Sequence, residues 1–212
     1  MAKRLQTQKE ELANAISHGI GLLAALVAIP FLVWQAAEKQ VAQSLLGAIV
    51  FSVGVVMVYT FSPLYHLAKN PKRKSRLQVL DHISIYFLIA GSYTPMMFAV
   101  LAPDVALIFL GFLWGSVLVG STLKLFFTGR FKVVSVAIYL LMGWLAVFFL
   151  DDIAAKINFE TLAWVGAGGL AYTAGVFFYV QSQKPFYHTI WHIFVLAGTA
   201  CHFVAVYHLV GI

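Results

Sequence analysis

Hydrophobic side chains fill seven long, continuous stretches of the chain, and short polar segments separate them. The stretches cover residues 16–36, 43–66, 81–101, 104–124, 133–151, 160–181 and 189–211. Each is close to the roughly 20 residues that a helix needs to cross a bilayer. They lack the alternation of barrel strands, and lipid accepts only helices or closed barrels as spanning structures. The pattern therefore predicts an all-α fold, an integral membrane bundle of seven transmembrane helices in one domain, residues 1–212.

Composition agrees with this class. Hydrophobic residues make up 61% of the 212 residues and charged residues 10%. The mean hydropathy is +0.88, whereas soluble domains are only about half apolar. The polar N-terminal segment carries glutamates and lacks a signal-peptide cleavage pattern, so we expect the first helix to be retained.

The basic residues predict the orientation. Twelve of the 14 lysines and arginines fall on the side of the predicted bundle that holds the N-terminus, and only Lys39 and Lys156 fall on the other side. Because basic residues favour cytoplasmic loops, we expect a cytoplasmic N-terminus and an external C-terminus. The net charge of +6 then reflects membrane topology, so we expect no nucleic-acid partner.

Polar side chains of four spans converge at the level of the N-terminal side. No comparable group forms at the opposite level. Ionisable residues within membrane spans usually face the bundle interior and are functional candidates. The converging residues are Glu11, Asn14 and His18 of the first span, Ser62 and His66 of the second, Asp81 and His82 of the third, and His188 and His192 of the last.

This arrangement indicates a metal site. His188 and His192 are four residues apart, about 40° around a helix, so both rings can reach one ion, and His66 can supply a third nitrogen. Three neutral imidazoles leave the fourth tetrahedral position of Zn²⁺ for water, as in catalytic sites. A carboxylate could then hold or deprotonate that water. Asp81 is the only acid available for this within the spans.

The other polar residues have simpler readings. Ser62 either bonds back to its own helix beside Pro63 or acts near the metal. His82 is expected to be interfacial. His202 lies about 15 Å along the last helix from His192, too far to join the same ion, but could line a cavity. Glu11, Asn14 and His18 are expected to cap the first helix and anchor it.

Several other kinds of site are disfavoured. Cys201 is the only cysteine, so no intrachain disulfide or thiolate cluster can form. Paired histidines on one helix crowd one ion and do not bracket a haem. A retinal protein would need a lysine deep in the last span, which has none. The small residues of GFLWG (111–115) and GAGG (166–169) predict helix packing.

Taken in order, the motifs ELANAISH, SPLYH, DHIS and HTIWH with CHF beyond it resemble the haemolysin III family, the bacterial branch of the progestin and adiponectin receptor superfamily. The resemblance covers essentially the whole chain. It implies a zinc ion bound by His66, His188 and His192, with Asp81 holding the zinc-bound water and Ser62 nearby. His82 departs from the receptors, which carry an aromatic residue there, and the short N-terminal region does not favour receptor-type ligand recognition.

The resemblance also implies a function. Alkaline ceramidases have similar sites, which suggests a zinc-dependent hydrolase of a lipid amide or ester in the bacterial inner (plasma) membrane, with membrane lipids as partners and a role in lipid homeostasis. A non-catalytic, zinc-stabilised membrane sensor is the alternative. A lytic pore is disfavoured because the outer half of the spans is almost wholly apolar.

Overall fold

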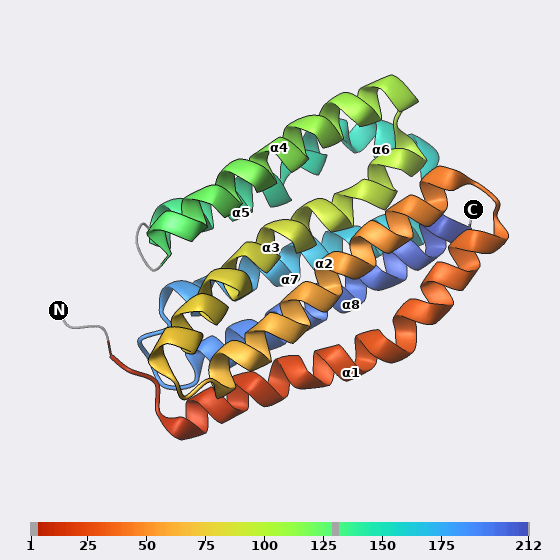
Figure 1. Ribbon diagram of the computed structural model, residues 1–212. Coiled ribbons are helices and arrows are strands. Elements are labelled where there is room, and N and C mark those ends of the chain that lie inside the picture. The colour runs from red at the N-terminus through yellow and green to blue at the C-terminus, as the bar shows by residue number, and fades with distance from the viewer. Residues whose placement is uncertain (1–3, 129–131, 212) are drawn as a thin grey trace.

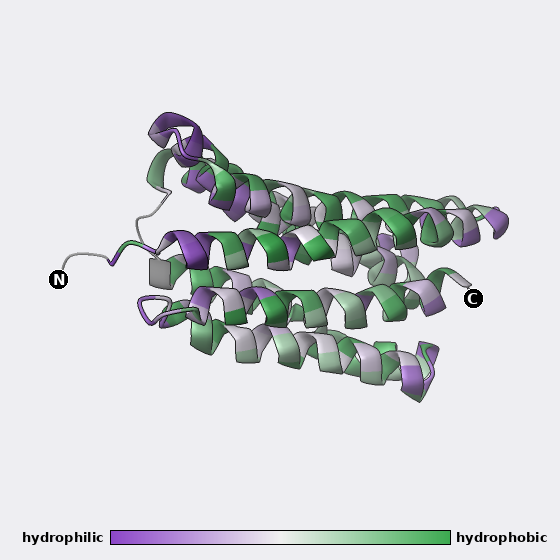
Figure 2. Ribbon diagram, turned by 90° about the horizontal axis from the view of Figure 1, so that it is seen from below, coloured by the Kyte–Doolittle hydropathy of each residue, from purple (hydrophilic) through white to green (hydrophobic). Residues whose placement is uncertain are grey.

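The computed structural model describes residues 4–128 and 132–211, which form an all-helical bundle with seven candidate membrane spans. The first helix begins at one end of the bundle, and the last helix ends at the opposite end (Figure 1). Hydrophilic residues gather at its two ends, and hydrophobic residues dominate its length (Figure 2). The elements are α1 (Gln8–Glu38), α2 (Ala42–Leu67), α3 (Pro71–Val100), α4 (Pro103–Phe127), α5 (Lys132–Gly143), the 3₁₀ helix η1 (Leu145–Phe149), α6 (Leu150–Lys156), α7 (Phe159–Val180) and α8 (Tyr187–Gly211). The seven-helix prediction is confirmed, with α5, η1 and α6 forming the fifth span.

Two helices extend well beyond their apolar stretches. The α1 helix begins at Gln8, where Thr7 and Glu10 form a capping box. The α3 helix begins at Pro71 because the Asn70 side chain accepts a hydrogen bond from the backbone of Arg73 and because proline suits the first helical position. Most of the polar segment before residue 81 is therefore helical, and it carries α3 out past the apolar layer.

The α2 and α3 helices pack closely at the centre of the bundle, and glycines allow the approach. A Cβ atom on Gly54 would lie 2.7 Å from the carbonyl oxygen of Phe87, and one on Gly47 would lie 2.7 Å from the Cα of Pro95. Because these contacts are with backbone, a larger residue would push the helices apart. This packing fixes the end of α2, with His66, next to the N-terminal part of α3, with Asp81.

The predicted small-residue contacts form only in part. A Cβ on Gly168 of α7 would collide with the His202 ring of α8, so this glycine is at a helix contact. Gly111 and Gly115 of α4, in contrast, have no atom near a built Cβ, and the prediction for GFLWG is wrong. The reason is that this side of α4 is open, as the 65% exposure of Phe112 shows.

The helix of the fifth span is interrupted in its middle, and the Tyr93 side chain forms hydrogen bonds with backbone groups on both sides of the interruption. The Tyr93 hydroxyl of α3 donates to the carbonyl oxygen of Gly143 at 2.7 Å and accepts from the backbone N–H of Ala146 at 2.9 Å. Irregular backbone at membrane depth persists only where its polar groups find such partners. Trp144 adds a hydrogen bond from its indole to Thr173 of α7.

An apolar cavity of about 210 Å³ lies between the fifth span and helices α3, α7 and α8. Its lining runs along α7 from Leu162 to Tyr179, so the cavity follows most of the length of that helix. His202 also lines it, which confirms the cavity role that the sequence suggested. We call this space the apolar cavity.

Candidate metal centre

His66, His188 and His192 lie together at the end of the bundle where α1 begins. Each offers one ring nitrogen, and these three atoms all lie within 4.8 Å of one another. His66 comes from the last turn of α2, and the other two come from the first turns of α8. His66 and His192 are 4% and 2% exposed. We call these three residues the histidine cluster; it could hold a metal ion.

The hydrogen bonds of His66 leave one nitrogen for an ion. Its Nδ1 lies 2.7 Å from Oε2 of Glu11, and because a carboxylate accepts, Nδ1 carries the proton and donates. The lone pair is then on Nε2, which is buried and has no hydrogen-bond partner among the described residues. A carboxylate behind a ligating imidazole is the usual way to fix its tautomer and orientation. The donor set therefore fits a metal.

His192 is oriented in the same manner by backbone. Its Nδ1 lies 3.1 Å from the carbonyl oxygen of Asn14, which can only accept, so Nδ1 donates and Nε2 keeps its lone pair. The Ser17 hydroxyl lies 3.1 Å from the same Nδ1. The Asn14 side chain accepts a hydrogen bond from Thr189, the neighbour of His188, at 2.6 Å. The first turns of α1 thus contact both helix segments that carry the cluster, which are the end of α2 and the start of α8.

Glu10 ties the segment before α1 to the start of α8. Its buried carboxylate accepts hydrogen bonds from the Arg4 guanidinium, from Thr7 and from the backbone N–H of Phe186. Phe186 has a φ of 60° just before α8 begins, and this bond holds that turn in place. The hydrogen bond to Glu10 raises the pKa of Arg4, so the pair stays ionised.

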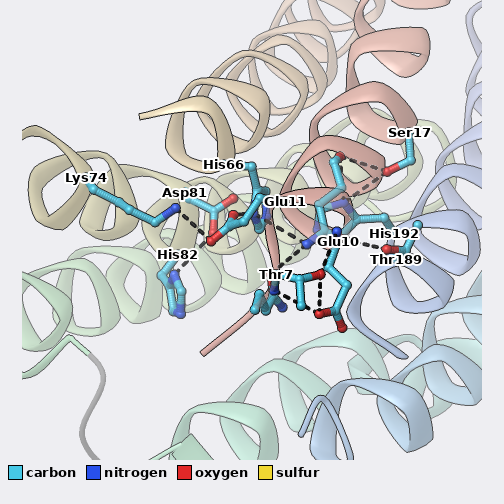
Figure 3. Close-up of polar contacts among 12 residues, drawn as sticks. Thr7, Glu10, Glu11, Ser17, His66, Lys74, Asp81, His82, Thr189 and His192 are labelled. Atoms are coloured by element: carbon cyan, nitrogen blue, oxygen red, sulfur yellow. Dashed lines mark hydrogen bonds and ion pairs between the residues drawn. The ribbon is translucent and has the colours of Figure 1, made fainter. Parts of the chain in front are cut away.

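The role expected for the first-span residues is partly wrong. The capping pair is Thr7 and Glu10, whereas Glu11 binds His66 on one side and the Lys74 ammonium at 2.8 Å on the other. Figure 3 shows Glu11 between these two partners. Spacing along the sequence could not reveal this, because the contact depends on how α1 packs against α2.

Asp81 lies near the cluster. Its carboxylate interacts electrostatically with His66 and His188, and its closest ion-pair contact is with Nδ1 of His82 at 3.3 Å. His82 stands outside the cluster, as expected.

Ser62 and His18 are buried polar residues without hydrogen-bond partners among the described residues. Ser62 is fully buried, and its hydroxyl does not bond back to α2, which excludes the simpler reading of this residue. His18 stacks on His192 with ring centroids 3.7 Å apart, and the edge of Tyr59 backs it. His18 therefore helps to fix the ring plane of His192 by packing.

Comparison with known proteins agrees with these motifs. The model of the family described as "Haemolysin-III related" matches residues 6–203, which include the histidine cluster. The chain belongs to this haemolysin III family. It is 38% identical to the "Hemolysin-3 homolog" of Bacillus subtilis over 94% of both chains. It is 35% identical to "Hemolysin-3" of Bacillus cereus over 97% of this chain and 94% of the relative.

The likeness extends to animals. The human "Monocyte to macrophage differentiation factor" is 27% identical over 93% of this chain and 83% of its own. The resemblance seen in the four motifs is therefore confirmed, and it places this haemolysin III family member in the wider superfamily of progestin and adiponectin receptors.

Replacing Glu11 by glutamine tests its support of the histidine cluster. The variant keeps the size of the side chain but removes the charge that holds the Nδ1 proton of His66. We expect metal affinity to fall about tenfold or more, in the range typical of groups behind metal ligands. The measurement is competition with a chelator of known affinity. Glu38→Gln, at the far end of α1, is the matched control, and equal affinities in the two variants would contradict the assignment.

Proposed function

We propose that this haemolysin III family member is a zinc-dependent hydrolase that cleaves an amide or ester bond of a membrane lipid. The observation that supports it most is the position of the apolar cavity beside the histidine cluster. Tyr179 lines the cavity, and its ring centroid lies 6.1 Å from that of His188. Trp191, also in the lining, directly precedes His192. A lipid chain that ends at Tyr179 would place its polar group on the side of the cavity next to His188.

His66, His188 and His192 are the residues that would hold the ion. Three imidazoles suit zinc, although the donor set alone fits other divalent metals too. When bound by three histidines, zinc polarises a carbonyl group and makes water nucleophilic near neutral pH. The protein's own contribution is to fix the rings, through Glu11 for His66 and through Asn14 for His192.

Asp81 and Ser62 are the proposed catalytic residues. Asp81 accepts a proton from the attacking water and returns it to the amine or alcohol that leaves as the carbon–nitrogen or carbon–oxygen bond breaks. The Ser62 hydroxyl, which has no other partner among the described residues, donates a hydrogen bond to the oxygen of the carbonyl group under attack. The products are a carboxylic acid and the amine or alcohol.

We further propose that the cluster lies at the cytoplasmic side of a bacterial plasma membrane. The basic residues of the chain support this orientation, and two of the similar proteins are bacterial. A lipid of the cytoplasmic leaflet then reaches the cluster without changing leaflet. Its acyl chain points to the bilayer centre, along the apolar cavity.

A non-catalytic role as a zinc-stabilised sensor is the second candidate. The hydrogen bonds from α1 to His66, His192 and Thr189 support it, because an ion would join three helices that already contact one another. The lining of the cavity, almost wholly apolar, does not support a water-filled pore.

An untargeted comparison of membrane lipids separates the two candidates. Cells that carry the wild-type protein are compared with cells that carry His66→Ala at equal expression. For a hydrolase we expect one lipid class to fall and its hydrolysis product to rise in the wild type only. Lipid changes without such a reciprocal pair would favour the sensor, and His208→Ala, at the opposite end of α8, serves as the control.

A further inference from the structure

One face of α7 forms a wall of the apolar cavity. The lining residues of this helix recur every three or four positions, as one side of a helix requires. Two of them, Gly166 and Gly169, are glycines in the middle of the wall. The lining residues of this face are Leu162, Val165, Gly166, Gly169, Tyr172, Thr173, Val176 and Tyr179.

These two glycines keep the cavity open. A Cβ built on Gly166 or Gly169 has no atom within 4 Å apart from its own helix, and the same is true of Gly143 on the facing wall of α5. Gly168 behaves in the opposite way, since its Cβ would collide with His202. Gly168 therefore serves helix packing, whereas a side chain at 166 or 169 would meet open space; both positions line the cavity, Gly169 half-buried and Gly166 exposed.

Several hydroxyl groups along the cavity already have hydrogen-bond partners. The Ser92 hydroxyl donates to its own helix, the Thr173 hydroxyl donates to the carbonyl of Gly169, and the hydroxyls of Tyr172 and Thr199 bond to each other. The unpartnered Nδ1 of His202 has no accessible surface. The walls are thus mostly apolar and these hydroxyls are engaged, so a plain hydrocarbon chain is the ligand that fits best.

We propose that Gly166 and Gly169 set the length of the acyl chain that the protein binds, with the ligand being one unsubstituted chain of a lipid. The proposal rests on the proposed function for the placement of the polar end of the chain at the histidine cluster. The two glycines lie at different distances from that end. A side chain at each glycine would therefore limit the bound chain at a different length along the cavity.

The helix rise converts these positions into chain lengths. Tyr179, beside the cluster, lies about 15 Å from Gly169, about 20 Å from Gly166 and about 26 Å from Leu162 at 1.5 Å per residue. An extended hydrocarbon advances roughly 1.3 Å per carbon, given carbon–carbon bonds of about 1.5 Å. A block at 169 leaves room for roughly twelve carbons and a block at 166 for roughly fifteen, whereas the open cavity takes up to roughly twenty.

The test measures binding and does not require turnover. Purified full-length protein, loaded with zinc, is mixed with equal amounts of saturated fatty acids of roughly eight to twenty carbons, and native mass spectrometry reads which lengths stay bound. We expect Gly166→Leu to lose the longest chains and Gly169→Leu to lose the middle ones as well. The ratio of long to short chains should fall at least about tenfold, because each methylene denied burial weakens binding about fourfold.

Gly111→Leu is the matched control. Its Cβ position is equally open, but it lies on α4 and does not line the cavity, so we expect the wild-type length profile. Gly169→Ala, a smaller change, should give an intermediate shift if the leucine variant does not fold. An unchanged profile in the glycine variants, the reverse order of the two leucine variants, or the same shift in Gly111→Leu would overturn the proposal.

The outcome is separable from that of the proposed hydrolase. The expected length shifts in a protein that cleaves no lipid would support the two glycines as length determinants and refute the enzyme. Lipid cleavage with a length profile that neither glycine variant changes would refute the length determinants alone.

Discussion

Replacing His188 and His192 together by alanine should abolish metal binding. We expect the wild-type protein to purify with about one zinc ion per chain, and the double variant with none, because a single remaining imidazole cannot hold the ion. The three ring nitrogens of the histidine cluster lie within 4.8 Å of one another, so all three can reach one ion. The measurement is elemental analysis of protein purified without added metal.

His202→Ala is the control for this experiment. It removes another histidine of the same helix, but one that lines the cavity and lies outside the cluster. Its metal content should equal that of the wild type. Full occupancy in the double variant would defeat the ligand assignment, and loss of metal in His202→Ala would show that the ion is held elsewhere or that α8 is disturbed.

The position of the cluster could be predicted because, in a membrane protein, the depth of each residue in the bilayer can be read from the apolar stretches. Once seven apolar stretches are placed across the membrane, each polar residue has a level, and residues of distant segments can be compared. His66 and the pair on α8 fall at one level in the sequence, and the structure brings the three together. In a soluble protein the same spacing would not have joined them.

The support around the cluster could not be predicted, because it depends on rotation about the helix axis. Glu11 and Glu10 are neighbours in sequence, yet one binds His66 and the other the start of α8. The apolar pattern of α1 does not decide which residue faces which helix, since lipid and protein interior are both apolar. Only packing distinguishes them.

The glycines illustrate the same limit. GFLWG and GAGG read alike as small residues for helix contact. In the structure Gly168 has that role, Gly111 lies on an open side of α4, and Gly166 lines the cavity. A glycine has no side chain whose polarity could reveal its surroundings. Three different structural roles therefore give the same sequence pattern. The break in the fifth span was hidden for a similar reason, because residues 133–151 are apolar on both sides of it.

Replacing Asp81 by asparagine should separate the metal from the chemistry. The side chain keeps its size and its place near His66 and His188, but it can no longer accept a proton. We expect zinc content to stay at the wild-type level while cleavage of a long-chain amide or ester falls by a factor of about 10²–10⁴, the usual contribution of a general base. Hydrolysis of a fluorogenic long-chain amide and elemental analysis of the same preparation measure the two quantities.

Asp104→Asn, in the first turn of α4, controls for the loss of an acidic group elsewhere in the protein. Wild-type turnover in Asp81→Asn would assign the base to another residue. Loss of zinc together with turnover would mean that Asp81 holds the ion directly, and a cluster with that fourth protein ligand would resemble closed structural sites more than open catalytic ones. The two readouts thus decide between a cation that the protein uses for hydrolysis and one that joins α2 to α8.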